Sequence, residues 1–225
     1  MKKLRTIFLL GGVIAVSALA CTDIGAPARA VPYESRLFIP FDDNGQPSID
    51  SLRFHWPRSS LPVTYWVEDS LGEPAHVRNA ISRWKAAFLY GEWDARVISD
   101  SSAADVIVRV LQPPPKPAPA TLRFRSLRPE CDGATDVDTV ATRLEFRLPV
   151  RMYLNPRLAS DPNLDLCLDI TTLHEMGHSM GLFQHTSDPL DIMFSNPVAE
   201  ELSDRDVSTI EALYHRDADM IPVRP

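Results

Sequence analysis

The segment His174–His185, with the sequence HEMGHSMGLFQH, is the feature that most constrains how this chain can fold. His174 and His178 are four residues apart, and on a helix this spacing places both imidazoles on one face, within reach of a single ion. Glu175 follows the first histidine and can point at an open coordination position without binding the metal. Gly181 predicts the end of the helix, because glycine readily adopts the left-handed conformation found there. The pattern predicts two metal ligands and one general base.

The residues after this helix extend the pattern. HTSDPLDIMF places Met193 eight residues beyond His185, and LSDRDVSTIEALYH at 202–215 predicts a final helix. Together these motifs resemble the metzincin clan of zinc endopeptidases. The resemblance is greatest to the matrixins, whose helix reads His-Glu-x-Gly-His-x-x-Gly-Leu and is followed by a methionine turn beneath the metal. It covers about residues 56–215 and is specific from 174 to 215.

The resemblance implies an α/β (α+β) fold: a metzincin-like catalytic domain with a twisted, mostly parallel sheet, an antiparallel edge strand, an active-site helix and a C-terminal helix. It implies a zinc endopeptidase that hydrolyses extracellular or periplasmic proteins or peptides. Glu175 would deprotonate a zinc-bound water and pass the proton to the leaving amine. The alternative, from a different class, is a non-catalytic surface lipoprotein that keeps the scaffold as a binding module. The retention of Glu175 favours the enzyme, because binding alone does not require a base.

The sequence departs from the matrixin pattern at the third ligand. The third histidine should stand ten residues after His174, but Gln184 occupies that position and His185 stands at eleven. Three interpretations compete: an extra loop residue with His185 as ligand, Gln184 as ligand in the way that snapalysins use an aspartate, or a degraded site. Imidazole binds zinc far better than a neutral amide oxygen, and the Met193 segment is in register only if His185 is the aligned residue. We therefore expect His174, His178 and His185 to hold the metal.

The first twenty residues predict an export signal. A positive start, Lys2, Lys3 and Arg5, precedes an apolar run over 7–20 that is too short to span a bilayer comfortably. Ala-Leu-Ala before Cys21 satisfies the small-x-small rule for cleavage and resembles a relaxed bacterial lipobox. We therefore expect an exported protein anchored to the cell envelope by a lipid on Cys21, with plain secretion as the alternative.

The chain has three cysteines, an odd number for an exported protein. Cys131 and Cys167 lie in the body of the chain and can pair in an oxidising compartment, which leaves Cys21 for the lipid. The alternative is that all three are unpaired or trimmed away. We expect a Cys131–Cys167 disulfide.

The remaining sequence predicts one domain at 52–217, after a tether or short pro-segment at 21–51 and before a tail at 218–225. Removing the signal takes 3 of 23 basic residues and none of 30 acidic ones, so the net charge moves from −7 to −10. An acidic surface argues against a nucleic acid partner. We expect a monomer whose one link to a membrane is the lipid.

Calcium is a second candidate cofactor. Asp132, Asp136 and Asp138 lie close together in the sequence and could bind calcium, with a solvated acidic loop as the competing interpretation. Periodicity elsewhere predicts strands and helices, whose expected ranges are 61–69, 104–112, 121–126 and 144–155 for strands, and 74–91, 165–180 and 203–214 for helices.

Overall fold

A computed structural model describes residues 30–41, 46–115, 117, 121–128, 130–157 and 160–224. The predicted signal at 1–20 and the lipid attachment at Cys21 lie outside the described residues. Residues Val31–Pro225 form one compact unit, to which the following description refers. Within the described part of the chain, no helix is long and apolar enough to cross a membrane.

The unit is a mixed α/β fold. Its elements follow one another in this order: β1 (Leu37–Phe41), β2 (Pro47–Leu52), η1 (Arg58–Ser60), β3 (Val63–Val67), α2 (Glu73–Ala86), β4 (Ala95–Ile98), η2 (Ser101–Ala103), β5 (Val106–Arg109), β6 (Thr121–Leu127), β7 (Cys131–Val140), η3 (Ala141–Arg143), β8 (Glu145–Pro156), α3 (Leu164–Met180), α4 (Asp204–Tyr214) and β9 (Ile221–Val223).

The main sheet runs in the spatial order β4-β3-β5-β8-β7-β6, with β9 paired to β8. Strands β4, β3, β5, β8 and β9 pair in parallel. Strand β7 runs antiparallel to both β8 and β6. A mostly parallel sheet therefore ends in antiparallel pairing at one edge, which confirms the expected fold class.

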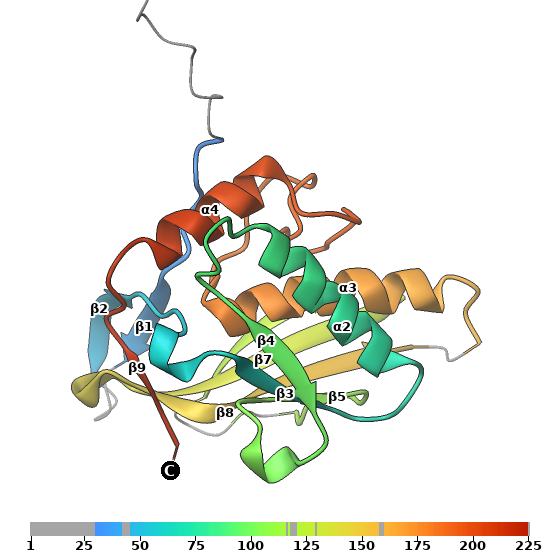
Figure 1. Ribbon diagram of the computed structural model, residues 1–225, viewed down its shortest axis with the longest axis horizontal. Helices are drawn as coiled ribbons and strands as arrows, with labels where there is room; N and C mark the ends of the chain where they lie inside the picture. The colour runs from blue at the N-terminus through green and yellow to red at the C-terminus, as the bar shows by residue number, and fades with distance from the viewer. Residues whose placement is uncertain are drawn as a thin grey trace, which may run out of the picture. The chain divides into compact units, whose positions relative to one another are not determined.

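Helices α2 and α3 lie along one face of this sheet (Figure 1). The apolar face of α2 is buried as its periodicity predicted, through Val77, Ala80, Ile81 and Trp84. The Trp84 indole N–H donates a hydrogen bond to the Leu173 carbonyl oxygen of α3 at 3.0 Å. Helix α3 is buried along most of its length, so α2 and the sheet fix its position from two sides.

The compact unit begins earlier than the sequence indicated, because the expected boundary at residue 52 lies inside it. Strands β1 and β2 form an antiparallel hairpin, and Leu37 and Ile39 are buried in the core. The Tyr33 hydroxyl donates to Asp206 Oδ1 of α4 at 2.8 Å. This segment lacks a clear period, and its order comes from long-range contacts that a local pattern cannot reveal.

Residues 218–224 of the predicted tail at 218–225 are also part of the fold. Met220 is buried in the core, and β9 adds a short parallel strand beside the start of β8. Three residues are too few to give a recognisable strand pattern, so the pairing with β8 is what makes this segment extended.

The stretch that carries the acidic cluster is strand β7 and not a solvated loop. Each of its three carboxylates lies against an arginine: Asp132 with Arg157, Asp136 with Arg123, and Asp138 with Arg151. These ion pairs neutralise the negative charge of the strand and occupy carboxylate oxygens that a calcium ion would need. The contacts among the described residues therefore do not support a calcium site.

Candidate functional site

Helix α3 carries the two predicted histidine ligands into the interior, where His174 and His178 are fully buried. The helix ends at Met180, and Gly181 follows in the left-handed conformation at φ 112°. A side chain at Gly181 would overlap the Phe54 carbonyl oxygen. The glycine therefore permits both the turn and the close packing that bring the following loop back toward the histidines.

Two backbone carbonyls fix the orientation of the buried imidazoles. His174 Nδ1 donates to the Ile192 carbonyl oxygen at 2.7 Å, and His178 Nδ1 donates to the Leu182 carbonyl oxygen at 2.6 Å. Each ring therefore keeps its Nε2 lone pair free, as metal-binding histidines do. Burial lowers the pKa of His174 to about 3 and also lowers the pKa of His178. Both rings are neutral at physiological pH, the form that binds metal.

His185 completes a group of three imidazoles. One ligand nitrogen from each of His174, His178 and His185 lies within 4.8 Å of the others. His178 Nε2 and His185 Nε2 are 3.2 Å apart, close to the roughly 3.3 Å expected between two nitrogens bound tetrahedrally to one zinc. Among the described residues, His174 Nε2 is one of the few buried polar atoms without a hydrogen-bond partner. A bound cation would satisfy it, so these residues fit a zinc ion.

Gln184 lies on the other side of the loop. Its side-chain amide donates to the Arg36 carbonyl oxygen at 3.0 Å, whereas the next residue, His185, turns its imidazole toward the other two. The structure thus places His185, and not Gln184, beside His174 and His178.

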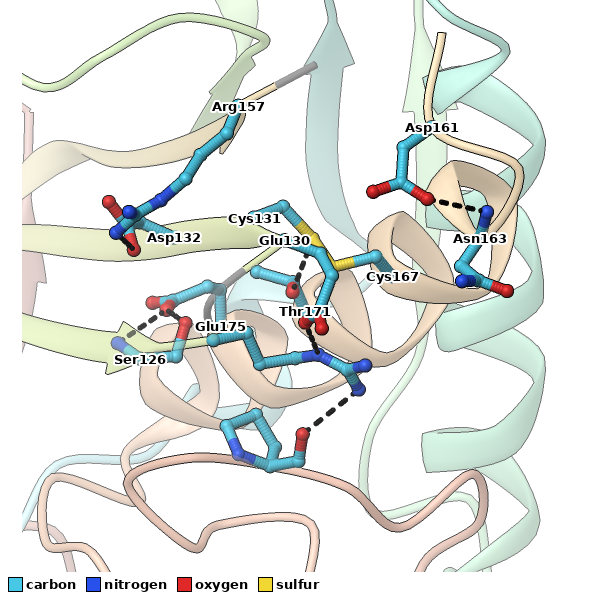
Figure 2. Close-up of a disulfide and its surroundings, with 12 residues drawn as sticks. Ser126, Glu130, Cys131, Asp132, Arg157, Asp161, Asn163, Cys167, Thr171 and Glu175 are labelled. Atoms are coloured by element: carbon cyan, nitrogen blue, oxygen red, sulfur yellow. Dashed lines mark hydrogen bonds and ion pairs between the residues drawn. A yellow bond between two sulfur atoms is a disulfide. The ribbon is translucent and has the colours of Figure 1, made fainter. Parts of the chain in front are cut away.

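The carboxylate of Glu175 is fully buried and enclosed by the two antiparallel strands. Oε1 accepts hydrogen bonds from Ser126 Oγ at 2.7 Å and Ser126 N at 3.3 Å (Figure 2). Oε2 accepts one from Thr135 Oγ1 at 2.7 Å. Burial raises the pKa of Glu175 to about 7, although these donors oppose the shift. The carboxyl group can therefore exchange a proton near neutral pH.

Sequence reasoning missed three residues around this carboxylate. Ser126 and Thr135 donate to it, and Gly133 leaves the space that it occupies, because a Cβ atom there would overlap Oε1. If β7 had been predicted as a strand, Gly133 and Thr135 would have been expected on the same face of the sheet, because they are two residues apart. The acidic composition of the segment concealed that strand.

The family comparison agrees with this geometry. The matrixin family model matches residues 122–215, which include the three histidines and Glu175. The chain is matrixin-like. No curated protein matches it. The family match supports a metalloprotease, and the three imidazoles support a metal site within it.

The expected methionine turn of the matrixin-like domain lies against helix α3. Met193 is fully buried, and a Cβ atom at Gly177 would stand 2.5 Å from its Sδ. The loop closes through a hydrogen bond from Thr186 N to the Met193 carbonyl oxygen at 3.0 Å. Asp206 Oδ2 accepts from Ile192 N at 2.8 Å, and so helps to position the carbonyl that orients His174.

A disulfide joins the same helix to the sheet. Cys131 at the start of β7 is bonded to Cys167 in the first turn of α3, with Cα atoms 6.2 Å apart (Figure 2). The bond ties the strand that encloses Glu175 to the helix that carries it.

Proposed function

We propose that the matrixin-like domain is a zinc-dependent endopeptidase acting on proteins or peptides. The observation that carries this proposal is the convergence of three histidine nitrogens, two from the buried helix α3 that also carries Glu175 and one from His185 in the loop after it. This arrangement lies within the matrixin match, so site chemistry and family resemblance support the same activity.

Each residue has a distinct role in this proposal. His174, His178 and His185 hold the ion as neutral imidazoles. Zinc, when bound, supplies a Lewis acid that polarises water and the substrate carbonyl. The Glu175 carboxylate accepts the proton of the attacking water and delivers it to the leaving amine. Glu175 does not belong to the group of metal-compatible side chains found among the described residues, which agrees with a base and not a ligand.

The second candidate is a binding module without catalysis. It is favoured by one observation: both oxygens of Glu175 are already hydrogen-bonded to protein hydroxyls, and the side chain is fully buried. Such a carboxylate cannot act on a substrate until its surroundings open. Retention of a glutamate at this position still favours the enzyme.

Metal analysis and a peptide-library cleavage assay separate the two functions. The enzyme is expected to contain about one zinc per chain and to cleave peptides. Glu175→Gln should keep the zinc and lose hydrolysis by at least about 100-fold, because general acid–base catalysis contributes this much or more. Zinc without cleavage in the parent chain would favour the binding module, and a chain that binds no zinc would contradict the enzyme.

We also propose that the protein is exported and carries lipid on Cys21. The support is the sequence alone: a positive start, a short apolar run and Ala-Leu-Ala-Cys. Mass spectrometry of the protein purified from membranes should find a lipidated N-terminus at Cys21. A mature chain that begins elsewhere, or lacks lipid, would overturn this part of the proposal.

A further inference from the structure

Strand β6 covers the side of the candidate site on which the Glu175 carboxylate lies. Ser126 in this strand bonds Glu175 through both its hydroxyl and its backbone N–H. The Phe124 ring lies 5.1 Å from the His178 ring, measured between centroids. Although His185 is exposed, Glu175 and His178 have no exposed surface. A metal ion can therefore approach beside His185, but a peptide cannot reach Glu175 while β6 stays in place.

The strand lies between two parts of the fold. On one side it pairs antiparallel with β7, where Ser126 stands opposite Gly133. On the other side Leu127 N donates to the Ser195 carbonyl oxygen at 2.9 Å. Arg128 Nη1 donates to the Pro197 carbonyl oxygen at 3.0 Å. The segment thus fills the space between the sheet and the loop after the methionine turn.

The two ends of β6 are held unequally. At its start, Arg123 forms two 2.6 Å bonds with Asp136 of β7. Its second half, Phe124–Leu127, contains one fully buried side chain, Ser126, while Arg125 and Leu127 are exposed. Phe124 is the one apolar side chain of this half that packs against the core, where it is partly buried. Because β6 is also the edge strand of the sheet, this half can open locally while the rest of the domain stays folded.

We propose that Phe124–Leu127 is an internal cover, and that an extended polypeptide takes its place beside β7 when the cover opens. This inference rests on the proposed peptidase activity and adds a regulatory step to it, the opening of the cover before a polypeptide can bind. Departure of the cover frees the backbone groups of Gly133 and Thr135 for a new antiparallel partner. It also releases Oε1 of Glu175 from Ser126, so that the base and the incoming peptide meet at one place.

Hydrogen exchange tests the opening independently of activity. In the zinc-loaded full-length chain, NMR should show the Ser126 amide exchanging at least about tenfold faster than the Val150 amide of β8, which is buried and donates to the Asp105 carbonyl oxygen at 2.9 Å. The Ser126 rate should be insensitive to low denaturant concentrations, because the opening is local. Equal protection of the two amides, or exchange of Ser126 only by global unfolding, would overturn the proposal.

A pair of variants tests whether the cover limits hydrolysis. Leu127→Pro removes the N–H that bonds Ser195, on the edge of β6 that faces away from β7, where proline is tolerated. Leu127→Ala keeps that N–H and shortens the same exposed side chain, so it is the matched control. Loss of one hydrogen bond of ordinary net strength should raise the open population about fivefold. Ser126 exchange and peptide cleavage should both rise by this factor in the proline variant and stay near the parent values in the control.

The outcomes separate this inference from the proposed function. Lower cleavage by Leu127→Pro with zinc and fold retained would mean that β6 is part of the working site, and would overturn the cover. Absence of cleavage in the parent and in both variants would contradict the peptidase. In that case the exchange comparison would still decide whether the segment opens.

Discussion

The side-chain amide of Gln184 donates a hydrogen bond to the backbone oxygen of Arg36, which lies 148 positions earlier in the sequence, at a distance of 3.0 Å. This contact holds Gln184 on the side of the loop that faces the N-terminal segment. His185 then lies on the opposite side, where its imidazole meets His174 and His178. A segment outside the domain predicted at 52–217 therefore contacts the residue that precedes His185.

Alanine substitutions of His185 and Gln184 should have unequal effects on the affinity of the protein for zinc. His185→Ala removes one of three imidazoles and should weaken zinc binding by orders of magnitude, because the remaining pair cannot complete a protein site of three ligands. Gln184→Ala should leave the affinity near that of the parent. Competition with a zinc indicator measures both dissociation constants. The reverse order of effects would show that Gln184 is the ligand.

Gly133→Ala should strongly lower the proposed peptidase activity without preventing metal binding. The new methyl group would overlap Oε1 and stand 2.7 Å from Cγ of Glu175, so the carboxylate must move. Misplacement of a catalytic group by about 1 Å can lower activity about 100-fold, and overpacking costs about 1–3 kcal/mol of stability. Cleavage rate, zinc content and urea unfolding are the three measurements. Full activity in this variant would show that the position of Glu175 in the structure is not its catalytic position.

Glu73 should make the protein less stable as the pH rises from about 5 to 8. It is fully buried at the start of α2, and its Oε1 accepts a 2.8 Å hydrogen bond from Thr172 Oγ1. Burial raises the pKa of Glu73 from 4.5 to about 8. Between these values the folded chain keeps a proton that the unfolded chain releases, so the free energy of unfolding falls with rising pH.

The neutral variant Glu73→Gln should remove this dependence. Relative to the parent, it should gain about 4 kcal/mol between pH 5 and pH 8.5, because most of the interval between the two pKa values lies in this range. Urea unfolding at both pH values measures the gain. Glu200→Gln, at an exposed position, is the control and should follow the parent. A Glu73→Gln profile parallel to that of the parent would show that Glu73 is ionised in the folded protein.

Loss of the Cys131–Cys167 disulfide should destabilise the domain. The bond closes a loop with a sequence separation of 36 residues, and by loop entropy it contributes about 3 to 4 kcal/mol. The double variant Cys131→Ala/Cys167→Ala should lose this amount in urea unfolding, whereas Cys21→Ser should unfold like the parent. Equal stability of the double variant and the parent would mean that the loop is already constrained without the bond.

The sequence by itself determined the parts of the site that depend on local geometry. His174, Glu175 and His178 fall within one helical turn, and any helix over this segment places the two imidazoles on the same face. Gly181 marked the end of that helix because the left-handed residue there is a local requirement. The helix and the loop that follows it could therefore be predicted without knowledge of the rest of the molecule.

Only the tertiary structure decided what surrounds that helix. The sequence of β7 resembles that of an acidic loop. The segment forms a strand in the folded protein because Arg123 and Arg151 from the two neighbouring strands neutralise Asp136 and Asp138. Ser126 of the edge strand reaches Glu175 across 49 positions of sequence. Strand pairing and burial depend on partners far along the chain, so the enclosure of Glu175 follows from the folded sheet and not from the pattern of any one segment.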